Sequence, residues 1–434
     1  MHFNLLPGGT LSGEARVPGD KSISHRAIML GALADGTTRV TGFLEGEDAL
    51  ATLAAFRAMG VEIEGPENGC VTVHGVGLYG LTAPSTPLDL GNAGTGMRLM
   101  CGLLAGQAFD TELTGDASLC ARPMGRVIDP LTRMGASIQS AQGGRPPLRI
   151  HGGQRLRGIH YDLPMASAQV KSCLLLAGLY SAGSTSVTEP ASTRDHTERM
   201  LRGFGYPVQS DQGVISLNGG GSLSACAIDI PADISSAAFL LVAASIAPGS
   251  DVLLTHVGIN PTRIGVVNIL RLMGANITLY RQREVGGEPV ADIRVQYAPL
   301  RGIEIPVAQV PLAIDEFPAL FIAAACATGR TVLRGAEELR VKESDRIAAM
   351  AEGLNTLGIQ NTVLEDGIII EGGVIGGGTI HTYHDHRIAM SFAIAALRAT
   401  ADITVLDCDH VATSFPGFDT LVRALGLRIT AAEG

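Results

Sequence analysis

Basic and small polar residues gather directly before apolar segments of the chain, where an anion could be held. In the first such cluster, Asp20, Lys21, Ser22 and Arg26 open an apolar segment that continues to residue 34. If this segment is a helix, Lys21 and Arg26 lie about one turn apart beside its unbonded N–H groups, and together they could hold a phosphate. For this motif alone, a capped helix with solvated cations is the alternative interpretation.

A glycine-rich stretch over residues 91–98, GNAGTGMR, opens the next apolar segment. Glycines such as Gly94 let backbone N–H groups approach a ligand, and Asn92 and Thr95 add polar side chains. The stretch lacks the Gly-Lys-Ser/Thr ending of a Walker A loop. A Gly-x-Gly-x-x-Gly match at residues 75–80 is followed by LTAPSTP where a dinucleotide fold needs a helix, so we expect a turn there.

Similar residue types recur further along the chain. Arg122 stands directly before a proline, and Ser167, Ala168 and Gln169 open a third apolar segment. Arg194 begins the charged run Arg-Asp-His. Arginine and small polar groups in these positions suit anion binding.

Carboxylates join the cations in the C-terminal half. Asp315 precedes an apolar segment, and the run RVKESDR brings Lys342, Glu343 and Arg346 together. Taken alone, such a run is typical of a solvated helix start. Acids placed beside cations are, however, also the residue types that move protons in catalysis.

The stretch 381–387, HTYHDHR, contains histidines and Asp385 that could bind a metal. Zinc requires ligands on one face, and residues divided between a strand end and a helix start rarely provide that arrangement. We therefore predict no metal here and expect Arg387 to bind a phosphate or a carboxylate.

A pattern of an apolar residue, a glycine and a strand-like segment recurs at intervals of about 70 residues. Each glycine follows an amphipathic helix pattern and is expected to end it in the left-handed conformation. Each repeat also contains a helix pattern that is apolar almost all round, which predicts a buried helix. The six glycines are Gly60, Gly135, Gly205, Gly274, Gly358 and Gly426.

The repeat predicts an α/β protein of two lobes with three units each. We expect one lobe to comprise residues 1–20 and 230–434, and the other residues 21–229. If the starts of the buried helices converge, their N–H groups and cations form an anion site. A solenoid whose repeats serve only stacking is the alternative.

Composition limits the possible functions. The chain has 434 residues, is 46% hydrophobic and 4% aromatic, and carries a net charge of −10. These values exclude a disordered chain and a coiled coil, and the charge has the wrong sign for a nucleic-acid or anionic-membrane binder. Seven scattered cysteines, no signal peptide and no segment able to span a bilayer predict a reduced, cytoplasmic protein.

Taken in order, these clusters closely resemble the 5-enolpyruvylshikimate-3-phosphate (EPSP) synthase family. The resemblance implies an inside-out α/β barrel in each of two lobes, built from βαβαββ units. The matching segments are PGDKSISHRA (18–27), LGNAGTGMR (90–98), GDASLCARPM (115–124), SAQVKS (167–172), STRDHTE (192–198), AIDEFPA (313–319), LRVKESDR (339–346), DHRIAMSF (385–392) and TSFPGF (413–418).

The resemblance implies transfer of the enolpyruvyl group from phosphoenolpyruvate to the 5-hydroxyl of shikimate 3-phosphate, a step of aromatic amino acid biosynthesis. It implies a monomer without metal or organic cofactor, and without nucleic-acid or membrane partners. Asp315 would take the hydroxyl proton, and Glu343, alone or with Lys21, would handle the proton at the vinyl carbon.

The resemblance also implies two sets of residues, one for each substrate. Shikimate 3-phosphate would be bound by Lys21, Ser22, Arg26, Ser167, Ala168, Gln169, Arg194, Asp315 and Lys342. Phosphoenolpyruvate would be bound by Lys21, Asn92, Gly94, Thr95, Arg122, Gln169, Arg346 and Arg387.

Three positions depart from the commonest bacterial and plant pattern of the family. Ala168 replaces a second serine, Arg194 supplies a cation, and Thr413 stands where that pattern has a lysine. All three resemble the second subgroup, which includes glyphosate-tolerant members. Gly94 is retained, whereas tolerant members can carry alanine there, so the response to glyphosate stays open.

Two alternative functions compete with this interpretation. The related transferases that act on UDP-N-acetylglucosamine have a reactive cysteine five residues before the arginine that corresponds to Arg122, and an asparagine after the first lysine. Here those positions hold Ala117 and Ser22, and we interpret Cys120 as a structural thiol. A non-enzymatic repeat scaffold is the other alternative, but it gives no reason for cations and acids to recur at helix starts.

Overall fold

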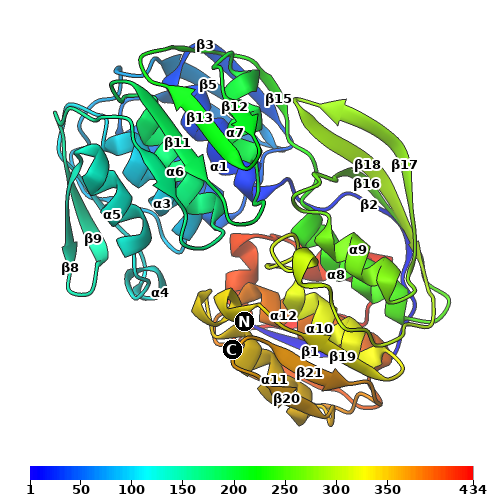
Figure 1. Ribbon diagram of the computed structural model, residues 1–434. Helices are drawn as coiled ribbons and strands as arrows, with labels where there is room; N and C mark the ends of the chain where they lie inside the picture. Colours follow the sequence, from blue (N-terminus) through cyan, green and yellow to red (C-terminus); the bar gives the residue numbers. More distant parts are fainter. Residues whose placement is uncertain (434) are drawn as a thin grey trace. The chain divides into compact units, whose positions relative to one another are not determined.

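The computed structural model describes residues 1–433, which divide into two compact units (Figure 1). Unit 1 contains Met1–Pro18, Pro231–Glu284 and the chain from Glu288 onward, and unit 2 contains Gly19–Ile230 and Val285–Gly287. Gly19, Asp20, Ile230 and Val285–Gly287, which we expected in the first lobe, belong to unit 2. Asp20 accepts a hydrogen bond from the Ile23 N–H at 2.9 Å, and the Ile230 N–H donates to the Thr41 carbonyl at 2.8 Å.

Across residues 1–433 the strands form six sheets, and unit 2 holds three of them, which share one topology. In each, a first strand lies parallel to a second, and an antiparallel hairpin inserts its later strand beside the second. This order confirms the βαβαββ repeat. The sheets are β6 (Leu88–Asp89), β7 (Thr111–Thr114), β9 (Arg145–His151) and β8 (Ser137–Ala141); β10 (His160–Asp162), β11 (Ser184–Thr188), β13 (Val214–Asn218) and β12 (Gln209–Asp211); and β14 (Leu223–Ser224) with β15 (Ala227–Asp229), β3 (Ala34–Thr41), β5 (Cys70–Val76) and β4 (Glu62–Glu67).

Unit 1 varies this topology, and two of its sheets include strands from distant parts of the chain. In its last sheet, the N-terminal strand β1 (His2–Leu5) pairs antiparallel with β23 (Ile403–Val405) and β24 (Ile429–Ala432), and β22 (Gly378–Ile380) lies parallel to β23. The other sheets are β2 (Ser12–Ala15), β16 (Asp251–Gly258), β18 (Glu288–Gln296) and β17 (Asn276–Val285); and β19 (Arg330–Leu333), β21 (Ile368–Glu371) and β20 (Asn361–Val363).

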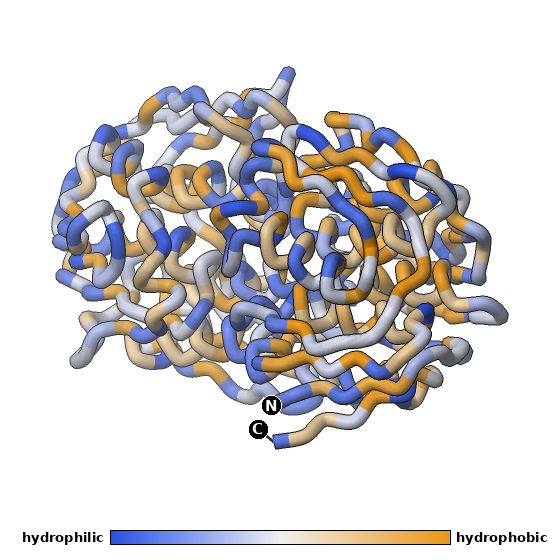
Figure 2. The backbone as a smooth tube through the Cα atoms, turned by 90° about the horizontal axis from the view of Figure 1, so that it is seen from below, coloured by the Kyte–Doolittle hydropathy of each residue, from blue (hydrophilic) through white to orange (hydrophobic). Residues whose placement is uncertain are grey.

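Buried helices fill the interior of each unit, as their all-round apolar sequences predict. The inner helices of unit 1 pack directly against one another, and α3 of unit 2 packs against both of its inner neighbours (Figure 1). Figure 2 shows apolar and polar stretches alternating along the backbone. The inner helices are α1 (Lys21–Leu33), α3 (Gly94–Leu104) and α6 (Ala168–Gly178) in unit 2, and α8 (Ile234–Ile246), α10 (Phe317–Cys326) and α12 (His386–Ala395) in unit 1.

Amphipathic helices form the second helix of each repeat, and each is followed by one of the predicted glycines. All six of those glycines have a positive φ, from 79° at Gly205 to 124° at Gly426, which confirms the left-handed stop. The amphipathic helices are α2 (Glu47–Ala58), α5 (Gly125–Met134), α7 (His196–Gly203), α9 (Gly265–Leu272), α11 (Arg346–Thr356) and α13 (Phe418–Leu425). Short helices α4 (Ala117–Cys120), η1 (Val307–Gln309), η2 (Glu337–Val341), η3 (Ala396–Arg398) and η4 (Asp409–Thr413) lie in the connections.

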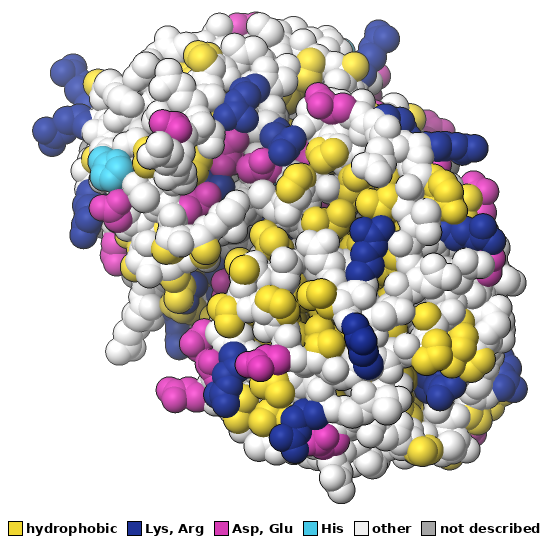
Figure 3. Space-filling view, turned by 45° about the vertical axis from the view of Figure 1, so that its right-hand side comes forward, with side chains coloured by type: hydrophobic (Ala, Val, Ile, Leu, Met, Phe, Trp, Pro, Cys, Tyr) yellow, Lys and Arg dark blue, Asp and Glu magenta, His cyan; other side chains and the backbone are white. Residues whose placement is uncertain are grey.

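The distribution of charged side chains and the state of the cysteines fit what the amino-acid composition predicts. Basic and acidic side chains are interspersed over the face drawn in Figure 3. The seven cysteines carry free thiols, and burial raises the pKa of Cys101 to about 12. Within residues 1–433, none of the helices combines the length and the apolar character that a membrane crossing requires.

Close contact between α3 and α6 depends on a glycine. A Cβ at Gly102 would lie 2.0 Å from the carbonyl oxygen of Cys173. We therefore expect Gly102→Ala to separate the two helices and to lower the free energy of unfolding by about 1–3 kcal/mol, as overpacking does. Urea denaturation measures this change.

Gly125→Ala is the matched control, because a Cβ at this first residue of α5 meets no atom within 4 Å. Equal denaturation midpoints for the two variants would contradict the close packing of α3 on α6.

Candidate active site

The start of α1 holds the first predicted cation. Asp20 caps the helix, and Lys21 follows as its first residue. The Lys21 Nζ lies 2.9 Å from Asp48 Oδ2, and their side chains are 17% and 10% exposed. Asp48 therefore holds the ammonium group at this helix start while part of it stays accessible.

Arg26 is buried and bound to three elements of unit 2. Its Nε donates to Thr197 Oγ1 at 2.7 Å, and its Nη2 donates to Ser172 Oγ at 2.8 Å. Its Nη1 donates to the carbonyl of Ser22 at 2.9 Å. These bonds connect α1 to α6 and α7, so Arg26 fixes the backbone of Ser22, a contribution that the motif alone did not reveal.

The glycine-rich stretch leaves the start of α3 without a side-chain cap. A Cβ at Gly94 would lie 3.0 Å from Arg122 Nη1 and 3.1 Å from Arg98 Nη1. Arg122 also donates from Nη2 to Asn92 Oδ1 at 2.6 Å. An uncapped helix start between two guanidinium groups is a good binding place for an anion.

The start of α6 lies beside the start of α3. Ser167 Oγ caps α6 by accepting from the Val170 N–H, and Ala168 is the first helical residue. Gln169 accepts from Arg98 Nη1 at 2.7 Å and donates to Thr95 Oγ1 at 2.9 Å. The sequence did not single out Arg98 as a site residue, although it closes the glycine-rich motif.

Helix α1 meets α3 on its other side. A Cβ at Gly96 would lie 3.7 Å from His25 Cε1 and 2.9 Å from Thr52 Oγ1. Within unit 2, the starts of the inner helices therefore lie together, as predicted. Arg194 is half-buried in the connection between β11 and α7.

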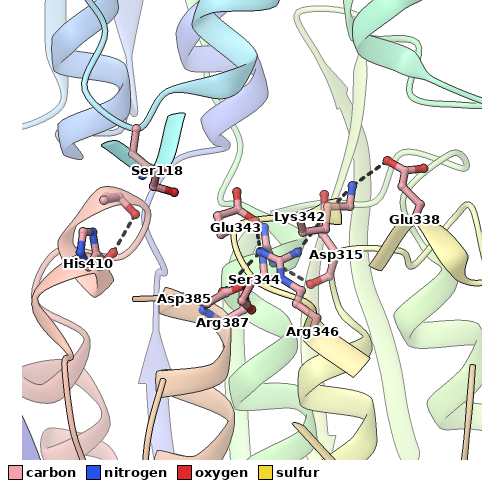
Figure 4. A network of polar contacts seen from close by, with 12 residues as sticks. Ser118, Asp315, Glu338, Lys342, Glu343, Ser344, Arg346, Asp385, Arg387 and His410 are labelled. Carbon is pink, nitrogen blue, oxygen red and sulfur yellow. Dashed lines mark hydrogen bonds and ion pairs between the residues drawn. The ribbon is translucent and has the colours of Figure 1, made fainter. Parts of the chain in front are cut away.

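Unit 1 brings two of the three predicted acid–base residues, Asp315 and Glu343, into one cluster, whereas Lys21 belongs to unit 2 (Figure 4). Asp315 Oδ1 lies 3.4 Å from both Lys342 Nζ and Arg346 Nη1. Arg387 Nη1 donates to the Asp315 carbonyl at 3.0 Å, and Lys342 also contacts Glu338 at 2.8 Å. The Asp315 carboxylate thus stands between two cations, which stabilise its charged form.

Arg346 is the buried centre of this cluster. It is 1% exposed, donates from Nε to Asp385 Oδ2 at 2.8 Å and pairs with Glu343. Burial alone would lower the pKa of the Arg346 guanidinium, but Asp385, Glu343 and Asp315 raise it on balance. Arg346 is therefore a permanent cation surrounded by carboxylates.

Asp385 binds groups of two helices and of the segment before α11. It caps α12 by accepting from the Arg387 N–H at 2.9 Å, and it accepts from Ser344 Oγ at 3.0 Å. The ring of His384 packs against His410, with 5.2 Å between centroids. Among residues 1–433, the potential metal ligands that lie close together are instead Glu62, Glu64 and His74 on the exposed side of a sheet.

The fold is shared with the enolpyruvyl transferase NikO from Streptomyces tendae, at a TM-score of 0.80 and 18% identity over 100% of this chain and 99% of that one. This likeness shows a common fold. The family described as EPSP synthase (3-phosphoshikimate 1-carboxyvinyltransferase) matches residues 5–421. The chain belongs to this family.

Two proteins are similar to this chain over nearly its full length. A 3-phosphoshikimate 1-carboxyvinyltransferase from Methylococcus capsulatus is 67% identical over 427 residues, which cover 98% of each chain. The structure of EPSP synthase from Acinetobacter baumannii matches at a TM-score of 0.90 and 59% identity and covers 100% of both chains. The resemblance found in the sequence motifs is thereby confirmed.

His25 gives unit 2 a predictable response to acid. Burial first, and then Lys21 and Arg26, lower the pKa of His25 to about 3. In the unfolded chain a histidine titrates near about 6.5, so the unfolded state binds more protons below that pH. The contribution of neutral His25 to stability is complete above about pH 6.5 and is lost as the pH falls toward about 3.

We expect about 2–3 kcal/mol of this contribution to be lost between about pH 7 and about pH 4.5. His25→Asn cannot titrate, so its free energy of unfolding in urea should fall less over this range. The same substitution at the exposed His160 is the control and should leave the pH response unchanged. Parallel pH curves for wild type and His25→Asn would contradict the burial of a neutral imidazole.

Proposed function

We propose that this chain transfers the enolpyruvyl group of phosphoenolpyruvate to the 5-hydroxyl of shikimate 3-phosphate and releases phosphate. The observation that carries the proposal is the match of residues 5–421 to the EPSP synthase family. The reaction belongs to aromatic amino acid biosynthesis. The proposal includes a cytoplasmic monomer that works without metal or organic cofactor and without nucleic-acid or membrane partners.

The reaction needs one acid–base group for each of two protons. The 5-hydroxyl oxygen attacks C2 of phosphoenolpyruvate and gives its proton to Asp315, while C3 gains a proton from Glu343, alone or with Lys21. This forms a tetrahedral adduct that still carries the phosphate. Removal of a proton from C3 then expels phosphate and restores the double bond. Two separately placed groups suit these opposite transfers.

The two substrates are anions that repel each other, so binding requires fixed cations. We assign shikimate 3-phosphate to Lys21, Ser22, Arg26, Ser167, Ala168, Gln169, Arg194, Asp315 and Lys342. We assign phosphoenolpyruvate to Lys21, Asn92, Gly94, Thr95, Arg122, Gln169, Arg346 and Arg387. The uncapped start of α3 between guanidinium groups supports the second assignment.

Phosphate release tests the proposal directly. The chain should release phosphate from phosphoenolpyruvate in the presence of shikimate 3-phosphate and not in the presence of UDP-N-acetylglucosamine. Release only with the nucleotide sugar would assign the chain to the alternative transferase. No release with either acceptor would favour a non-enzymatic role.

Asp315→Asn removes the proposed base while keeping the size of the side chain. We expect turnover to fall at least about a hundredfold, because loss of a general base has that effect. Binding of shikimate 3-phosphate, measured by calorimetry, should stay detectable. Asp402→Asn, at an exposed position of unit 1, is the control. Turnover like that of the wild type would remove Asp315 from the mechanism.

Gly94→Ala tests the phosphoenolpyruvate assignment. The added methyl group meets Arg122 at 3.0 Å and Arg98 at 3.1 Å. We expect KM for phosphoenolpyruvate to rise and inhibition by glyphosate, the larger molecule, to weaken more. Gly91 has open space around it but a positive φ, so Gly125→Ala is the better control. Equal glyphosate inhibition of variant and wild type would argue against this placement.

A further inference from the structure

Lys171 is a buried ammonium group to which the proposed mechanism gives no task. The chain has only three lysines, and the other two, Lys21 and Lys342, belong to the proposed site. Their side chains are 17% and 19% exposed, whereas that of Lys171 is 1% exposed. A charge this deeply buried is costly unless partners compensate it, so those partners indicate its role.

Two buried glutamates compensate Lys171, and they lie on either side of the segment that carries Arg194. The Lys171 Nζ lies 3.1 Å from Glu189 Oε2 and 2.7 Å from Glu198 Oε1. Glu189 follows strand β11, and Glu198 lies in the first turn of α7. Lys171 therefore binds both ends of the segment 189–198 to helix α6.

The segment is fixed at further points. Thr193, the residue before Arg194, donates its hydroxyl to Glu189 Oε1. Thr197 donates to Ser172 Oγ at 2.7 Å, and Arg26 donates to both of these hydroxyl groups. The second oxygen of Glu198, Oε2, is buried without a hydrogen-bond partner among residues 1–433, so the charge of Glu198 depends on Lys171.

We propose that Lys171 is a positioning residue for the shikimate 3-phosphate half of the site. Its ion pairs with Glu189 and Glu198 hold Arg194 in a fixed relation to Ser167 and Gln169, which open the same helix that carries Lys171. This inference rests on the proposed function. Residues that act by placing a binding group change the affinity for the substrate of that group more than for the other substrate.

The test compares steady-state constants of Lys171→Met with those of the wild type, by phosphate release. We expect KM for shikimate 3-phosphate to rise at least about tenfold, while KM for phosphoenolpyruvate and kcat change less than about threefold. A merely structural role would move all three constants or none, and either result would overturn the proposal. Glu67→Gln, at an exposed position of unit 2, is the control.

Lys171→Met leaves two buried glutamates unpaired and can fail to fold. The triple variant Lys171→Met, Glu189→Gln, Glu198→Gln removes every charge of the group and so avoids this penalty. It should keep KM for shikimate 3-phosphate raised, because the ends of the segment are no longer held. Recovery of the wild-type KM in the triple variant would show that Lys171 only neutralises charge and would overturn the proposal.

Amine labelling of the unaltered protein supplies an independent measurement, because only three lysines and the N-terminal amine can react. Lys171 should react slowest, and saturating shikimate 3-phosphate should slow it at least about tenfold further, since a ligand that binds the ordered segment suppresses its opening. Phosphoenolpyruvate alone should not slow the labelling of Lys171. Fast, ligand-independent labelling of Lys171 would overturn the proposal. Absence of phosphate release by the wild type would count against the proposed function instead.

Discussion

The first N–H groups of each inner helix have no partner within the helix and need partners elsewhere. Side chains supply them at four helix starts, through Asp20 on α1, Ser167 on α6, Asp233 on α8 and Asp385 on α12. Helices α3 and α10 have no side-chain cap among the described residues. These two starts carry Gly94 and follow Asp315, the residues assigned to phosphoenolpyruvate and to the base. At these two starts no side-chain cap within residues 1–433 competes with a charged reactant for the first N–H groups.

The same constraint explains how the charged residues are held. Arg346 is surrounded by Asp385, Glu343 and Asp315, and Lys171 by Glu189 and Glu198. Buried cations are stable only with such partners, so each of these cations needs acids beside it. An acidic protein with a net charge of −10 can therefore present local binding places for anions.

Repetition made much of the fold predictable from the sequence. Glycines such as Gly60 and Gly426 mark helix ends because only their backbone adopts the required conformation easily, and that signal is local. Residues 1–20 were expected in the lobe of the C-terminal units, but the pairing of β1 with strands around Ile403 and Ile429, at the other end of the chain, was not predicted. Pairing over that distance leaves no periodic trace in a single sequence.

The site was predictable in its residue types but not in its internal contacts. The sequence indicated Lys21, Arg122, Asp315 and Arg346, because charge near an apolar helix is visible in the sequence. Their partners depend on tertiary packing. Asp48 lies in an amphipathic helix that gives no sign of the Lys21 contact, and Asp385 shares its sequence stretch with histidines, whereas its bonds go to Arg346 and Ser344. The charged residues at the inner-helix starts differ from repeat to repeat, and their partners determine what each start can bind. The strands and amphipathic helices recur in every repeat and hold those starts in place.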